Sequence, residues 1–260
     1  GVMEKNGKAI FPFGFVQGNV SRAALENVAQ ADHTAIMRWN YMWNHEGATN
    51  LTQLLAVAEA CGLDVIDKTE DASKEHLPKG RENPCNIIPR DAAHQKELMT
   101  SLTQSLEKAR PAIEQHVRAI MDHKNLIGYF CGHEPNLVNV EARMAKARVE
   151  YEVAHKTDPY RPVFAVFARE IPPGGLDVCD VAQYDVYNYP GWANQFYGCP
   201  SYVSDQVLKL KRQADPAGKV VFLVLMAEGL DVGRCPRLML PDEQRCQTYL
   251  TIIHGAKGLS

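Results

Sequence analysis

The chain lacks long hydrophobic runs and long runs of one charge. Its longest apolar stretches, such as Val220 to Ala227, are far shorter than the roughly 20 residues of a membrane-spanning helix. We therefore expect no membrane partner. The 28 basic and 31 acidic residues give a net charge of −3 without a long basic run, so we also expect no nucleic-acid partner held through the phosphate backbone. No charged leader followed by an apolar segment precedes the first strand.

Several motifs that carry cofactor or nucleophile chemistry are also missing. The seven cysteines contain no C-x-x-C pair, and neither an H-E-x-x-H helix nor a G-x-S-x-G elbow is present. We therefore predict no cofactor and no metal. Cys85, Cys199 and Cys235 lie in loops that contain proline and glycine, and they could form disulfides if the protein is exported.

What the sequence does contain is a regular alternation of strand-like and helix-like segments. Pro111 is expected to interrupt the longest helical stretch and to begin a second helix at its first turn, and residues 69–89 are expected to form a charged loop. Strands are predicted over residues 9–16, 33–41, 63–68, 126–132, 162–168, 181–189 and 219–227, and helices over 21–32, 50–61, 90–124, 140–155, 201–214 and 241–256.

The alternation predicts an α/β fold with a parallel sheet, because each strand is a nearly continuous apolar run and must be covered on both faces. Eight such units in about 250 residues is the size of a (β/α)8 TIM barrel. A doubly wound open sheet is the alternative, but no strand leads into a glycine-rich phosphate loop. We predict one barrel domain over residues 1–260. The barrel is expected to be truncated at strand eight, which begins at 258–260, and to belong to a longer chain with flanking domains.

Aromatic side chains collect where the functional loops of such a barrel would lie, after the carboxyl ends of the strands. Trp43 follows the second predicted strand, and Tyr187, Tyr189 and Trp192 lie at or just after the sixth. Aromatic rings around a cleft stack on the apolar faces of sugars, so we predict a carbohydrate substrate. The alternative is that these rings pack the loops at the top of the barrel.

Carboxylates mark the same edge of the predicted sheet. Glu134, followed by Pro135, ends the fourth strand, although the dipole of the next helix would also favour an acid there. Glycoside hydrolysis needs two carboxylates that flank the bond, and Glu228 at the end of strand seven is the natural partner. It could instead be a solvated loop acid. Asp185, inside the sixth strand, is a third candidate because a carboxylate in an apolar run needs a partner or a function.

Other polar residues surround these positions. Arg38, Asn40 and His45 lie at the end of strand two, and His133 precedes Glu134. We expect these four to bind sugar hydroxyls, although solvated loop residues would look the same. A second polar set follows strand three. It consists of Asp67, Lys68, Glu70 and Asp71.

Several segments resemble the catalytic barrel of the clan A glycoside hydrolases. Residues 6–14 (NGKAIFPFG) resemble a first strand of the type NGKPFFPIG, and residues 125–136 (NLIGYFCGHEPN) resemble a fourth strand of the type LIGYxxxDEPN. Residues 155–163, 183–190 and 241–259 are similar to the family's segments DPxRPV, DxYP and EQRxxxYxAIxxGAKGI. The resemblance spans nearly the whole chain.

The resemblance implies a retaining glycoside hydrolase. Glu134 would be the acid/base and Glu228 the nucleophile supported by Tyr187 or Tyr189, while His133 stands where the family has asparagine. Cleavage of a poly- or oligosaccharide would imply a secreted or periplasmic protein. Two alternatives stay open: a carbohydrate-binding barrel without catalytic activity, and a metal-dependent barrel enzyme.

Overall fold

The computed structural model describes residues 3–17, 21–38, 51–168, 170–186, 200–225 and 240–259. The strands are β1 (Met3–Lys5), β2 (Lys8–Ile10), β3 (Gly14–Gln17), β4 (Ala35–Arg38), β5 (Asp64–Lys68), β6 (Leu126–His133), β7 (Val163–Phe167), β8 (Val181–Val186) and β9 (Val220–Leu225). The α-helices are α1 (Arg22–Gln30), α2 (Leu51–Ala60), α3 (Glu70–Lys74), α4 (Ala92–Ile120), α5 (Val140–Thr157), α6 (Pro200–Ala214) and α7 (Pro241–Ile253).

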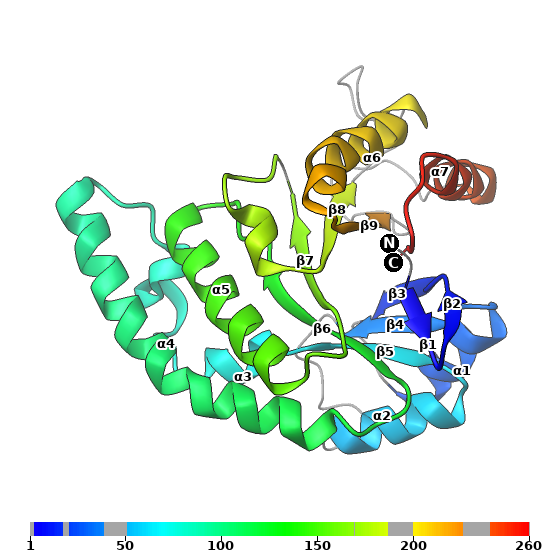
Figure 1. Cartoon of the computed structure of the whole chain (residues 1–260), viewed down its shortest axis with the longest axis horizontal. Helices are drawn as coiled ribbons and strands as arrows, with labels where there is room; N and C mark the ends of the chain where they lie inside the picture. Colours follow the sequence, from blue (N-terminus) through cyan, green and yellow to red (C-terminus); the bar gives the residue numbers. More distant parts are fainter. Residues whose placement is uncertain are drawn as a thin grey trace.

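One curled sheet organises these elements. Strands β3 to β9 are all parallel and lie side by side in chain order, as expected from the alternating pattern. The sheet curls at the centre of the molecule, and the helices surround its outer face (Figure 1). Leu259 forms isolated parallel bridges with Phe13, just before β3, and with Leu223 of β9. The result is a curled parallel sheet that is consistent with a partial barrel.

Most residues of the parallel strands are apolar because both faces of the sheet are buried. Ile36 of β4 packs in the same cluster as Leu54 and Leu55 of α2, on the outer face of the sheet. The next residue, Met37, belongs to a cluster with Phe130 and other side chains of the strands. This alternation produces an outer core between sheet and helices and an inner core enclosed by the sheet.

The first predicted strand, over residues 9–16, is wrong in its extent. The structure places β2 before Pro12 and β3 after it, because proline has no N–H to donate to a sheet ladder. Strand β2 pairs antiparallel with β1 in a separate two-stranded sheet.

The prediction that Pro111 divides the long helix is also wrong. Helix α4 runs through Pro111 without a break. A proline inside a helix costs about 3 kcal/mol, but the buried stripe of α4 continues on both sides, with Leu106 and Ala109 before it and Ile113 and Val117 after it. Burial of these side chains outweighs the lost hydrogen bond.

The intervals between the main elements hold short helical turns. The predicted loop 69–89 contains α3 and two 3-10 turns, Gly80–Glu82 and Pro84–Asn86. Between β7 and β8, the described residues form the 3-10 turn Gly175–Val178. A further 3-10 turn, Asp215–Ala217, precedes β9. Among the described helices, none has the length and apolarity to cross a membrane.

Candidate active site

The backbone at the end of β6 turns sharply and presents Glu134 at the carboxyl edge of the sheet. The pairing of β6 with β7 shifts register between Phe130 and His133, which re-aims the side chains that follow. Gly132 has a φ of 82° and Glu134 a φ of 47°. A left-handed conformation is strained for a glutamate and is characteristic of functional sites.

Hydrogen bonds to β7 and its loop hold this turn. The Glu134 N–H donates to the Val166 carbonyl at 2.8 Å, and the Glu134 carbonyl accepts from the Leu137 N–H at 3.1 Å. The Asn136 side chain accepts from the Ala168 N–H at 3.2 Å, just after β7. The position of the glutamate is therefore fixed by the backbone of the neighbouring strand.

Three of the predicted site residues come together here. One ligand atom from each of His133, Glu134 and Asp185 lies within 4.8 Å of the other two. Asp185 is two residues beyond the buried Gln183 and four beyond Val181 on β8, and Val181 belongs to the inner core. The alternation along the strand thus places Asp185 on the inner face of the sheet. A pair of carboxylates at close range is an arrangement that general acid–base chemistry uses.

The same three groups have the donor types of a divalent metal site, an imidazole and two carboxylates. Ligand atoms about 2.0–2.2 Å from one zinc ion would lie about 3.3 Å apart. In this cluster the three ligand atoms all lie within 4.8 Å of one another. The donor set thus suits a divalent metal as well as a carboxylate pair beside a histidine.

His133 is held in its neutral form. Burial lowers the pKa of its imidazole to about 4, and the positive charges of Lys68 and Arg143 add to this effect against the opposing charge of Glu70. Its Nε2 lies 3.7 Å from Oε2 of Glu134. At neutral pH the imidazole is therefore an uncharged neighbour of the carboxylate.

Arg38 belongs to a buried ion network. Its guanidinium donates to the carboxylates of Asp67 at 2.9 Å and Asp71 at 2.6 Å, and to the Lys68 carbonyl at 2.9 Å. Nε2 of His116 lies 2.6 Å from the second Asp67 oxygen. Burial alone would raise the pKa of Asp67, but Arg38 and His116 outweigh it and lower the pKa to about 2. Only 3% of the Arg38 side chain is exposed, and these bonds hold its guanidinium in place; its binding of a sugar hydroxyl stays a prediction.

The remaining predicted site residues lie outside the described part of the chain. The pairing of Glu134 with Glu228 across the mouth of a barrel, and the binding of sugar by the aromatic cluster, therefore stay predictions. The residues concerned are Asn40, Trp43, His45, Tyr187, Tyr189, Trp192 and Glu228.

A cavity of about 590 Å³ next to His133 was not predicted from the sequence. Lys68 and Glu70 belong to the polar set after the third predicted strand, but Arg143 and Lys146 of α5 also line the cavity. Lys146 and Glu150 are four residues apart, a spacing that is typical of solvent-exposed helix pairs. In the structure both side chains are buried, so the spacing gave no signal of a cavity.

The fold is similar to that of solved glycoside hydrolases. A GH2 β-galacturonidase from Eisenbergiella tayi, bound to galacturonate, matches 98% of this chain at 15% identity with a TM-score of 0.61. A β-glucuronidase from Ruminococcus gnavus matches 98% at 13% identity and a TM-score of 0.61. A β-galactosidase from Marinomonas ef1 matches 95% at 10% identity and a TM-score of 0.66.

These likenesses concern the fold. The chain spans only 44% of the length of the first two enzymes and 53% of the third. No protein-family model matches the sequence, and no curated protein is similar to it. The chain thus has a glycoside-hydrolase-like fold.

Proposed function

We propose that the chain is the catalytic barrel of a retaining glycoside hydrolase that acts on a poly- or oligosaccharide. The observation that carries the proposal is the Glu134 turn. A carboxylate stands at the carboxyl edge of a parallel sheet, held there by a left-handed backbone and close to a second carboxylate and a neutral histidine. The resemblance of the fold to GH2 enzymes supports the same function.

The proposed architecture is a closed (β/α)8 barrel. Leu259 supports it, because this residue bridges to Phe13 at one edge of the sheet and to Leu223 at the other. Its carbonyl accepts from the Gly14 N–H and its N–H donates to the Pro12 carbonyl. Residues around Leu259 would then be the eighth strand.

In the proposed reaction, the carboxyl group of Glu134 protonates the glycosidic oxygen while the Glu228 carboxylate attacks the anomeric carbon. The C–O bond to the leaving group breaks, and a covalent glycosyl-enzyme forms. The Glu134 carboxylate then removes a proton from water, which attacks the same carbon and releases Glu228. The configuration at the anomeric carbon is retained because two inversions occur.

A leaving-group series separates the two roles. Aryl glycosides with good leaving groups need little general-acid help in the first step, whereas alkyl glycosides need it fully. For Glu134→Gln we expect the rate of hydrolysis of alkyl glycosides to fall about 10²–10⁴-fold. The initial burst of leaving group released from aryl glycosides should fall much less. For Glu228→Gln we expect the hydrolysis of alkyl glycosides and the burst from aryl glycosides both to disappear. NMR of the anomer formed first would report retention.

The matched control is Glu97→Gln, which removes an exposed carboxylate from α4 and should leave every rate unchanged. Full activity of Glu134→Gln on alkyl glycosides would refute the assignment of the acid/base. Inversion at the anomeric carbon would refute the retaining mechanism.

A metal-dependent enzyme is the second candidate, since His133, Glu134 and Asp185 have the right donor types. It predicts that a chelator removes activity and that a divalent cation restores it. Sugar binding without hydrolysis of any glycoside would instead favour a carbohydrate-binding barrel.

A further inference from the structure

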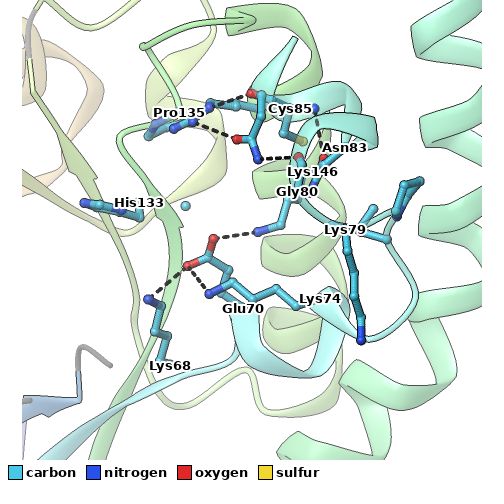
Figure 2. A pocket seen from close by; sticks show the side chains of 15 residues that line it. Lys68, Glu70, Lys74, Lys79, Gly80, Asn83, Cys85, His133, Pro135 and Lys146 are labelled. Carbon is cyan, nitrogen blue, oxygen red and sulfur yellow. Dashed lines mark hydrogen bonds and ion pairs between the residues drawn. The ribbon is translucent and has the colours of Figure 1, made fainter. Parts of the chain in front are cut away.

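A cavity next to the candidate active site is lined mainly by positive charge. It lies between the β5–α3 and β6–α5 connections, with the segment 77–86 along its other side (Figure 2). Five cationic side chains and one carboxylate line it. The cations are Lys68, Lys74, Lys79, Arg143 and Lys146, and the carboxylate is Glu70. We call this space the basic cavity.

Three ammonium groups share the Glu70 carboxylate. Lys146 lies 2.9 Å from one oxygen, and Lys68 and Lys74 lie 3.4 Å and 3.9 Å from the other. Figure 2 shows the carboxylate between these three ammonium groups. One negative charge cannot neutralise three positive ones, and burial strengthens the field that is left.

Acids behind the wall of the cavity compensate part of this charge. Glu150 lies 2.8 Å from Lys146, and Asp71 lies 3.5 Å from Lys74. Asp71 also binds Arg38 at 2.6 Å, so its charge is shared with a cation outside the cavity. Glu150 and Asp71 do not themselves line the cavity, so the charges that do line it are five cations and one carboxylate.

Arg143 adds a charge without a carboxylate partner among the described residues. Its guanidinium donates to the Cys85 carbonyl at 2.9 Å, the Asn86 side-chain oxygen at 3.2 Å and the Glu134 carbonyl at 3.4 Å. These neutral oxygens fix the position of the guanidinium and leave its charge uncompensated. Lys79, which is exposed, forms no ion pair within the described chain.

The titration of Lys74 reports the same field. Burial and the nearby charges of Lys146 and Arg38 together lower the pKa of its ammonium group to about 8, against the opposing charge of Glu150. An anion that binds beside a lysine held among other cations stabilises the charged form of that lysine.

The basic cavity adjoins the candidate active site. Gly132, His133 and Pro135 line it, and Nε2 of His133 is 3.7 Å from the Glu134 carboxylate. Its volume of about 590 Å³ lies within the usual range of small-molecule sites, about 300–1,000 Å³. It is thus large enough for a sugar unit as well as an anionic substituent.

We propose that the basic cavity binds the oxyanion of an acidic saccharide, a sugar that carries a carboxylate, sulfate or phosphate group. Lys74, Lys79 and Arg143 are the groups that contact the oxyanion, and His133 connects its site to Glu134. The saccharide part of this proposal rests on the proposed function, whereas the preference for an anion rests on the charges alone.

Calorimetric titration of the purified protein tests the proposal. The probes are glucuronate, glucose 6-sulfate and glucose 6-phosphate, with glucose as the neutral reference, each at low and at physiological salt. We expect at least one acidic sugar to bind at least about tenfold more tightly than glucose, since a hydrogen bond to a charged group is worth about this factor or more. This preference should shrink as salt screens the exposed lysines.

The variants are Lys79→Gln, which removes an exposed charge, and the double variant Lys74→Gln/Lys79→Gln. The control is Lys108→Gln, which removes an exposed lysine of α4 that does not line the cavity. We expect about a tenfold loss of acidic-sugar affinity in the double variant and no loss in the control. Circular dichroism would confirm that each variant is folded.

Two results would overturn the proposal: equal binding of acidic and neutral sugars, or an unchanged affinity in the folded double variant. Failure of the proposed function can be distinguished from failure of the cavity assignment, because binding is measured without turnover. A protein that binds acidic sugars through Lys74 and hydrolyses no glycoside keeps the cavity assignment and loses the enzymatic one. A hydrolase with no preference for acidic sugars loses the cavity assignment alone.

Discussion

Replacement of Asp67 by asparagine should destabilise the fold in a pH-dependent way. The carboxylate is fully buried and has a pKa of about 2 in the folded chain against an ordinary value of 3.8. This difference corresponds to about 2 kcal/mol of stability at neutral pH. Asp71 still neutralises Arg38 in the variant, so we expect the total loss at pH 7 to be about 2–4 kcal/mol, below the upper range for an orphaned buried charge.

The sign of the pH dependence follows from the lowered pKa. A carboxyl group whose pKa is lower in the folded state stabilises the fold above its unfolded value, and this contribution disappears as the pH falls toward the folded value. For Asp67 the window runs from 3.8 down to about 2. About half of the contribution should be gone at pH 3.

Urea denaturation followed by circular dichroism, at pH 7 and at pH 3, would measure the effect. The gap in unfolding free energy between wild type and Asp67→Asn should narrow by about 1 kcal/mol between the two pH values. Asp122→Asn, at an exposed position that forms no ion pair with any described residue, should differ from wild type by less than about 0.5 kcal/mol. A gap for Asp67→Asn that stays constant or widens in acid would refute the reasoning.

Three further results are expected. Gly132→Ala should cost about 1–3 kcal/mol in urea denaturation, because φ is 82° and the new Cβ would lie 3.0 Å from the Cβ of Ala147. An unchanged free energy of unfolding would show that position 132 tolerates a side chain and would contradict this prediction. Lys146→Met should cost about 3–5 kcal/mol in the same assay, since the buried Glu150 carboxylate loses its lysine partner and Glu70 loses one of three; a variant as stable as wild type would contradict this. In alkylation at pH 8 read by mass spectrometry, the exposed Cys246 should react before the buried Cys85. Burial raises the pKa of the Cys85 thiol to about 11 and leaves about one thiolate in a thousand, so equal labelling would contradict this.

The sheet could be predicted from the sequence because its strands are buried on both faces. Segments such as 163–167 and 220–225 contain only apolar residues, and short apolar runs that alternate with helices are typical of a covered parallel sheet. The exceptions are local. Pro12 divides the first segment, and α4 continues through Pro111 because tertiary packing overrides the preference of one residue.

The candidate site could be predicted only where the chain order already brings residues together. Glu134 follows β6 and Asp185 lies near the carboxyl end of β8, with β7 between them in one parallel sheet, so the topology brings both to the same edge. The basic cavity depends on which side chains of α3 and α5 turn inward, and a lysine on a helix has the same sequence signature whether it is buried or solvated. Arg38 illustrates the opposite case. It lies at the predicted edge but is bound by two aspartates.

The shared carboxylate of Glu70 also restricts how this protein can change over evolutionary time. Lys68, Lys74 and Lys146 come from a strand and two helices, and all three depend on it. Loss of the Glu70 charge would remove the one acid that all three lysines share, so single substitutions at position 70 would be eliminated, whereas substitutions paired with position 146 could persist. In an alignment of relatives, these positions should therefore covary, and an acidic or basic residue should rarely be replaced at one of them alone.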